Sequence, residues 1–124
     1  MIAGVAWALA ATLQQGTIDW AALPSLPYRA PPAVTDAMDA FVAREARARR
    51  CPLPPASGAA QTMTVELAVL IQGDGGVRAV VPRAINCATV EQYAAGLVAA
   101  FARSNLVGAS EQWYRTSLTF SWTR

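Results

Sequence analysis

Two cysteines, Cys51 and Cys87, are the side chains of this chain with the most direct chemical potential. A thiolate can act as a nucleophile, or two thiols can pair in a disulfide. A nucleophilic role needs a base to activate the thiol, and the sequence contains no histidine. In an exported domain of this size an even cysteine count favours a bridge, whereas two isolated cysteines in a cytosolic protein are typically unpaired buried thiols. We therefore expect a Cys51–Cys87 disulfide in an exported chain.

Acidic side chains could carry acid–base chemistry without histidine. Asp74 falls in a glycine-rich turn, Glu66 in a strand-like run and Glu91 at the start of a predicted helix. Catalysis by carboxylates needs two of them facing one another across a pocket, and these positions predict no such pair. The commonest metal ligand, histidine, is also absent. We expect no enzyme activity, no metal site and no cofactor.

The segment Gly73–Gly76, with the sequence Gly-Asp-Gly-Gly, could be a phosphate loop or a hairpin turn. It contains no lysine, and its glycine spacing fits neither phosphate-binding fingerprint, both of which lead into a helix. It lies instead between two strand-like runs, Met63–Gln72 and Val77–Val81. Glycines at such a position supply the positive φ values of a tight hairpin. We therefore expect an antiparallel hairpin here.

Length and composition allow one domain with a modest core, because the chain has 124 residues, of which 54% are hydrophobic and 15% charged. A formal net charge of +2 is too small to indicate nucleic-acid binding. Arginines cluster at the end of the first predicted helix, at positions 44, 47, 49 and 50. Cations there stabilise a helix C-terminus; an anionic partner is the alternative interpretation.

Residues 1–16 are predicted to be a signal-peptide-like segment. The run Met1–Leu13 is apolar and contains an Ala-x-Ala triplet at residues 8–10, as a secretory signal does before its cleavage site. It is too short to cross a bilayer of roughly 30 Å as a helix. An apolar arm packed on the domain is the alternative. The expected localisation is therefore the periplasm, after export.

Residues 17–33 are predicted to form a Pro-rich linker or a strap laid over the domain. Their four prolines disfavour regular structure. Trp20 and Tyr28 would anchor such a strap, or would belong to a partner site.

Residues 34–124 are predicted to form one α+β domain with two helices. The first starts near Thr35, and the second runs from Val90 to Arg103. Thr89 and Gln92 match a capping box at the start of the second helix, and Asn105 suits a left-handed cap at its end.

The strands follow the helices in the order α-β-β-α-β. Apolar and polar residues alternate in Met63–Gln72 and in Trp113–Thr123, which is typical of strands with one buried face. A right-handed crossover through the second helix places the last strand beside the first. We therefore predict a three-stranded antiparallel sheet in the order 2-1-3, with both helices on one face.

The last strand is the candidate binding site. It forms one edge of the predicted sheet, contains no proline, and lies opposite the edge that ends at Pro82. An open edge can accept an extended peptide through main-chain hydrogen bonds. We expect this partner-binding edge at Trp113, Arg115, Ser117 and Thr119, with pairing of two copies through the same strand as an alternative.

The chain resembles the C-terminal domain of TonB-like energy transducers over roughly its last 90 residues. The resemblance rests on the α-β-β-α-β order and on four motifs: the alternation of Val65, Leu67, Val69 and Ile71, the family's D-G-x-V turn at Asp74–Val77, the Ala-rich helix Val90–Ala102, and the closing Leu118, Phe120 and Trp122. It implies a free-standing periplasmic module for protein binding, related to transport, with a segment of an outer-membrane receptor as a candidate partner. A secreted inhibitor or ligand-binding module stabilised by one disulfide is the alternative function.

Overall fold

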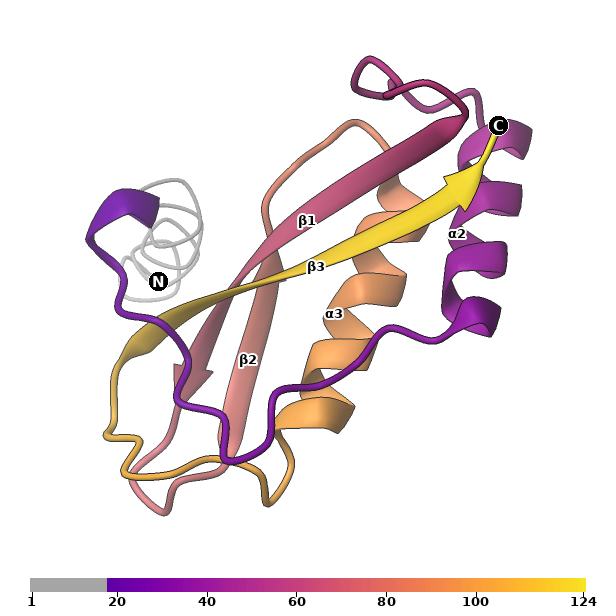
Figure 1. The fold of residues 1–124 in the computed structure, drawn as a ribbon. Coiled ribbons are helices and arrows are strands. Elements are labelled where there is room, and N and C mark those ends of the chain that lie inside the picture. The colour runs from indigo at the N-terminus through magenta and orange to yellow at the C-terminus, as the bar shows by residue number, and fades with distance from the viewer. Residues whose placement is uncertain (1–17) are drawn as a thin grey trace, which may run out of the picture.

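A computed structural model describes residues 18–124 of the chain (Figure 1). The predicted signal peptide, and the apolar arm that is its alternative, lie outside the described residues. The elements, in chain order, are η1 Trp20–Ala22, α2 Asp36–Ala48, β1 Ala60–Ile71, β2 Val77–Pro82, α3 Ala88–Ala102 and β3 Trp113–Thr123.

The three strands form an antiparallel sheet in the order β2-β1-β3, and both long helices cover one of its faces (Figure 1). The predicted fold class and strand order are confirmed. β1 begins at Ala60 rather than at Met63, because its first residues pair with the end of β3, from Ala60 opposite Thr123 onward. The early part of β1 is polar on its open face, so hydrophobic alternation alone underestimates its length.

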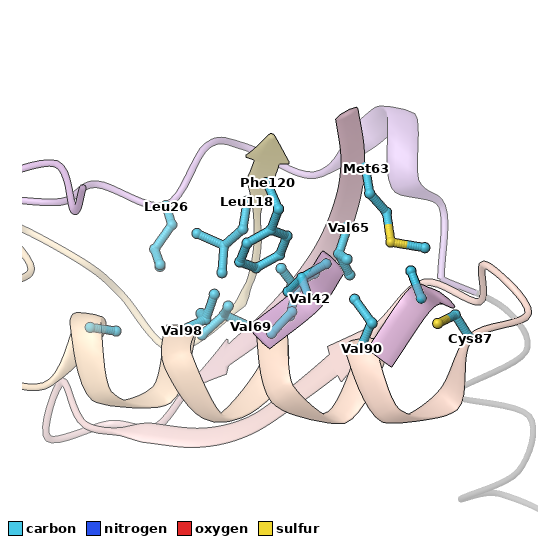
Figure 2. Packing of buried hydrophobic residues seen from close by; sticks show 14 of the residues in the cluster. Leu26, Val42, Met63, Val65, Val69, Cys87, Val90, Val98, Leu118 and Phe120 are labelled. Carbon is cyan, nitrogen blue, oxygen red and sulfur yellow. The ribbon is translucent and has the colours of Figure 1, made fainter. Parts of the chain in front are cut away.

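The core lies between the sheet and the two helices (Figure 2). Alternate residues of β1 point toward the helices, and Val65, Leu67 and Val69 have no exposed surface. Phe120 of β3 is also fully buried. Removal of this apolar surface from water is the main force that holds α2 and α3 on the sheet.

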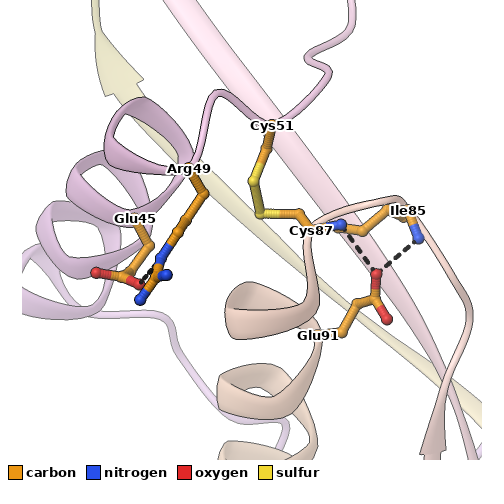
Figure 3. Close-up of a disulfide and its surroundings, with 6 residues drawn as sticks. All are labelled: Glu45, Arg49, Cys51, Ile85, Cys87 and Glu91. Carbon is orange, nitrogen blue, oxygen red and sulfur yellow. Dashed lines mark hydrogen bonds and ion pairs between the residues drawn. A yellow bond between two sulfur atoms is a disulfide. The ribbon is translucent and has the colours of Figure 1, made fainter.

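A disulfide joins Cys51, just after α2, to Cys87, just before α3 (Figure 3). The two Cα atoms are 5.3 Å apart and the residues are separated by 36 positions in the sequence. The expected bridge is therefore confirmed. It ties the end of one helix to the start of the other on the same face of the sheet.

The start of α3 differs from the predicted capping box. The helix begins at Ala88 with Cys87 as its N-cap, so Thr89 lies inside the first turn. The Glu91 carboxylate accepts hydrogen bonds from the N–H groups of Ile85 and Cys87, at 3.0 and 3.1 Å (Figure 3). An ionised acceptor that binds two N–H groups near the positive end of the helix caps it better than one hydroxyl does.

Replacing Glu91 with alanine is expected to lower the free energy of unfolding by about 1–2 kcal/mol, because two N–H groups lose a charged acceptor. Gln92→Ala is the matched control, since Gln92 is an exposed neighbour in the same turn. Urea denaturation of both variants, with the disulfide intact, measures the difference. Equal stabilities would show that the carboxylate does not act as a cap.

Candidate functional site

β3 pairs with β1 along its whole length, from Trp113 opposite Leu70 to Thr123 opposite Ala60. In an antiparallel pair, successive residues direct their main-chain groups to opposite sides of the strand. The Ile71 N–H donates to the Gln112 carbonyl at 3.1 Å, so even-numbered residues of β3 face β1. The odd-numbered residues therefore face outward, and these include all four predicted site residues: Trp113, Arg115, Ser117 and Thr119.

The open edge is interrupted at Arg115. The Arg115 N–H donates to the Pro24 carbonyl, and the Arg115 carbonyl accepts from the Leu26 N–H, both at 2.8 Å. Ser25 thus forms a parallel bridge with Arg115. Leu26 is 6% exposed and belongs to the core, so this contact is packed as well as hydrogen-bonded. Arg115 is paired on both sides, and the available edge starts beyond it.

Residues 24–30, which we call the strap, begin at this bridge and run toward α2 (Figure 1). Asn105 holds the strap by two side-chain bonds to the main chain of Ala30, of 2.9 and 2.8 Å. Asn105 therefore fixes the strap. The left-handed residue after α3, expected at Asn105, is its neighbour Ser104, with a φ of 55°. Tyr28 forms a bridge with Leu106 and packs against the core. Burial raises the pKa of Tyr28, and the nearby Thr116 hydroxyl offsets part of this shift. The Tyr28 hydroxyl makes no hydrogen bond within residues 18–124.

The side chain of Arg115 is also engaged within the chain. Its Nη1 donates to the Trp20 carbonyl at 3.1 Å, and the Trp20 ring lies 5.3 Å from the guanidinium of Arg83. The side chains of both Arg115 and Arg83 therefore contact Trp20, the first residue of η1. The guanidinium of Arg115, one of the predicted site residues, therefore contacts the segment that precedes the strap.

The far end of the edge is covered by α2. The Ser121 N–H donates to Oδ1 of Asp39 at 2.9 Å, which occupies the next outward donor along β3. Asp39 belongs to the first turn of α2. Its contact with β3 had no signal in the sequence, because it depends on how the helix packs beside the strand.

Ser117 and Thr119 remain between the strap and Asp39. Both residues are exposed, and within residues 18–124 their outward N–H and C=O groups have no hydrogen-bond partner. The Thr119 hydroxyl lies 2.9 Å from that of Thr64, which fixes its side chain on the face away from the helices. We call the open main-chain groups of Ser117 and Thr119 the β3 window. Trp113 is on the same side of β3 but is separated from this window by the contact of Arg115 with the strap.

The acidic residues considered for catalysis have structural contacts. Glu66 forms an ion pair with Arg83 at 2.8 Å, and Glu91 caps α3. Asp74 accepts from the Gly76 N–H at 2.8 Å, a bond that, with a smaller contribution from Gln72, lowers the pKa of the carboxyl. Each carboxylate serves a local contact in the fold.

Comparison of the chain with family models, curated proteins and solved structures gives no match. Across residues 18–124 no helix is long and apolar enough to cross a membrane. The same residues contain no group of three or more His, Cys, Asp or Glu side chains that could hold a metal ion.

Removing the carboxylate of Asp39 is expected to lengthen the window by one residue. In Asp39→Ala the Ser121 N–H loses its acceptor, so its hydrogen exchange should become at least tenfold faster. Asp36→Ala is the matched control, because Asp36 is the other acidic residue of the same helical turn. Amide exchange followed by NMR makes the comparison. Unchanged exchange at Ser121 in Asp39→Ala would show that the carboxylate does not cover the edge.

Proposed function

We propose that this chain is an exported protein-interaction module that binds an extended partner segment by strand addition at β3. The observation that carries the proposal is the pair of exposed residues, Ser117 and Thr119, whose outward main-chain groups lack partners within the described chain. Such groups form a template for another strand. The strap, which bonds to Arg115 through its main chain, is an example of an extended segment that uses this edge.

The window sets a limit on the partner. With the strap and Asp39 in place, the contact region extends from about Thr116 to Thr119, so the bound segment is short. It must be extended and must not have proline at a position that donates to the Ser117 or Thr119 carbonyl. Side chains of Ser117 and Thr119 lie beside the bound segment and would contribute selectivity.

Two further observations support a periplasmic module of the TonB C-terminal type. The disulfide is typical of oxidising compartments outside the cytosol. The α-β-β-α-β order and the sheet order on which the resemblance depends are present in the fold. A segment of an outer-membrane receptor is the candidate partner that follows from this resemblance.

A photo-reactive amino acid at Thr119, introduced in living cells, tests the proposal. Its side chain is exposed beside the open main-chain groups, so we expect it to cross-link to a defined envelope protein. The same group at Val107, which is 54% exposed on a loop, is the matched control. Equal cross-linking patterns from the two positions would contradict the proposal. A cross-link to a protein from outside the cell envelope would favour the alternative function, a secreted inhibitor.

Pairing of two copies through β3 is the competing use of the same edge. Sedimentation at increasing concentration separates the two, because self-pairing would shift the protein to a dimer without any partner. In the purified monomer the Ser117 and Thr119 amides should exchange rapidly. Slow exchange in the monomer would show that this edge is already paired and would exclude the proposal.

A further inference from the structure

β1 is longer than its neighbour β2, which leaves a second gap in the sheet. β1 spans Ala60–Ile71, but its pairing with β2 reaches back only to Leu67 opposite Pro82. One more bond extends the pairing, in which the Arg83 N–H donates to the Glu66 carbonyl at 2.8 Å. Before Glu66, the described chain provides no strand on this side of β1.

The main-chain groups in this gap belong to Thr62 and Thr64. Odd-numbered residues of β1 bond to β3, as Ile71 does, so even-numbered residues point into the gap. Among residues 18–124, the N–H and C=O groups of Thr64 have no hydrogen-bond partner, and neither does the Thr62 N–H. The Thr62 carbonyl accepts from Nε2 of Gln61 at 3.1 Å. Three strand-spaced groups are therefore available in a row.

A cavity of about 420 Å³ opens beside these groups, lined by Pro52, Pro54, Thr62, Met63, Thr64 and Ile85. Its two walls are fixed in place. Pro54 is held through its carbonyl, which accepts from Gln61 Nε2 at 2.9 Å, and Ile85 is held through its N–H by Glu91 (Figure 3). The disulfide joins the segments that carry these walls, so the groove is formed before any ligand binds.

The lining determines the chemistry of the occupant. None of the lining residues is charged. Glu66, the next residue of β1 on this side after Thr64, is neutralised by Arg83 at 2.8 Å. Burying a charge beside such a surface would be unfavourable, so the occupant is uncharged. A row of main-chain donors and acceptors at strand spacing is complementary to another extended main chain. A side chain that faces Met63 and Ile85 would be apolar.

We propose that this groove binds a short, uncharged, extended segment of a partner protein by strand addition to β1. The gap is closed at one end by the Ser57–Ala60 bridge and at the other by Arg83. The 11-residue β3 of a second folded copy is longer than this gap and would collide with its ends. A single partner segment of about five residues fits, because each residue advances about 3.4 Å along a strand.

The test uses the oxidised full chain and the peptide acetyl-Thr-Val-Thr-Val-Thr-amide. Free protein should exchange the Thr62 and Thr64 amides at least tenfold faster than Val65, whose N–H faces β3. The peptide should slow exchange at Thr62 and Thr64 and shift the NMR signals of Met63 and Ile85. Slow exchange of the Thr64 amide in the free protein would overturn the proposal. Protection of the Thr62 and Thr64 amides that rises with protein concentration in the absence of peptide would also overturn it, and would assign the groove to a second copy of the chain.

A variant separates this groove from the β3 window. Ile85→Trp adds a larger side chain to the cavity wall and should weaken peptide binding at Thr64 at least tenfold. Val107→Trp is the control, because Val107 is exposed on the loop between α3 and β3 and does not line the groove. If the peptide protects only the Ser117 and Thr119 amides, the proposed binding at the groove is wrong and the proposed function at β3 is supported. If it protects only the Thr62 and Thr64 amides, binding at the groove is supported and binding at β3 is not. The wild-type exchange measurement decides the matter if Ile85→Trp fails to fold.

Discussion

Replacing Cys51 and Cys87 together with serine is expected to lower the free energy of unfolding by about 4 kcal/mol. The bridge closes a loop of 36 residues, and its removal returns that conformational entropy to the unfolded chain. Both side chains are also buried, with 9% and 3% of their surface exposed, so the serine hydroxyls would need new partners. Since domains of this size are stable by about 5–15 kcal/mol, the loss would be a large fraction of the total.

Urea denaturation followed by circular dichroism measures this effect. The wild-type protein in reductant is the matched control, because it has the same thiols without the bond, and it should unfold close to the midpoint of the double variant. The double variant itself should not respond to reductant. A difference below about 1 kcal/mol between oxidised and reduced wild type would contradict the prediction and show that the helices are held by packing alone.

The fold was predictable because its main signals are local. Alternation in β1 and β3, the glycine turn and the helical spacing of apolar residues each depend on a few neighbouring positions. The bounds of β3, Trp113 to Thr123, match the prediction. The start of α3 did not match, because its cap depends on Glu91 reaching back to the N–H groups of Ile85 and Cys87, whereas the sequence pattern indicated a capping box at Thr89.

The site was predictable only in part, for a related reason. Alternation along β3 correctly indicates that Arg115, Ser117 and Thr119 share one side of the strand. It cannot show what lies beside that edge, since the contacts with Leu26 and Asp39 join residues distant in sequence. A Pro-rich segment has no periodicity from which its register could be read.

The gap beside Thr64 was hidden for a different reason. It arises from unequal strand lengths, and the early residues of β1 extend the strand through pairing with β3 rather than through hydrophobic alternation. A disulfide that fixes the neighbouring loops was expected. Its consequence for the shape of the surface depends on the three-dimensional path of those loops.

Ser117→Pro is expected to weaken partner binding at β3 at least tenfold while leaving the protein folded. The Ser117 N–H points away from β1 and has no partner within residues 18–124, so proline at this position removes no ladder bond of the described sheet. It does remove the donor that an added strand would use, and its ring blocks the close approach of that strand. Titration with the partner segment cross-linked through Thr119 measures binding, and a thermal melt of the same samples measures folding.

Ser117→Ala is the matched control, because it deletes the hydroxyl and keeps the N–H. Recognition through the main chain predicts that this variant binds within about twofold of the wild type, whereas loss of a neutral side-chain hydrogen bond would cost about 1 kcal/mol. Thr116→Pro completes the series, because the Thr116 N–H faces β1 and its loss should destabilise the sheet itself. Strand addition at β3 is incorrect if Ser117→Pro binds as well as Ser117→Ala in folded protein, since the outward N–H would then have no part in recognition.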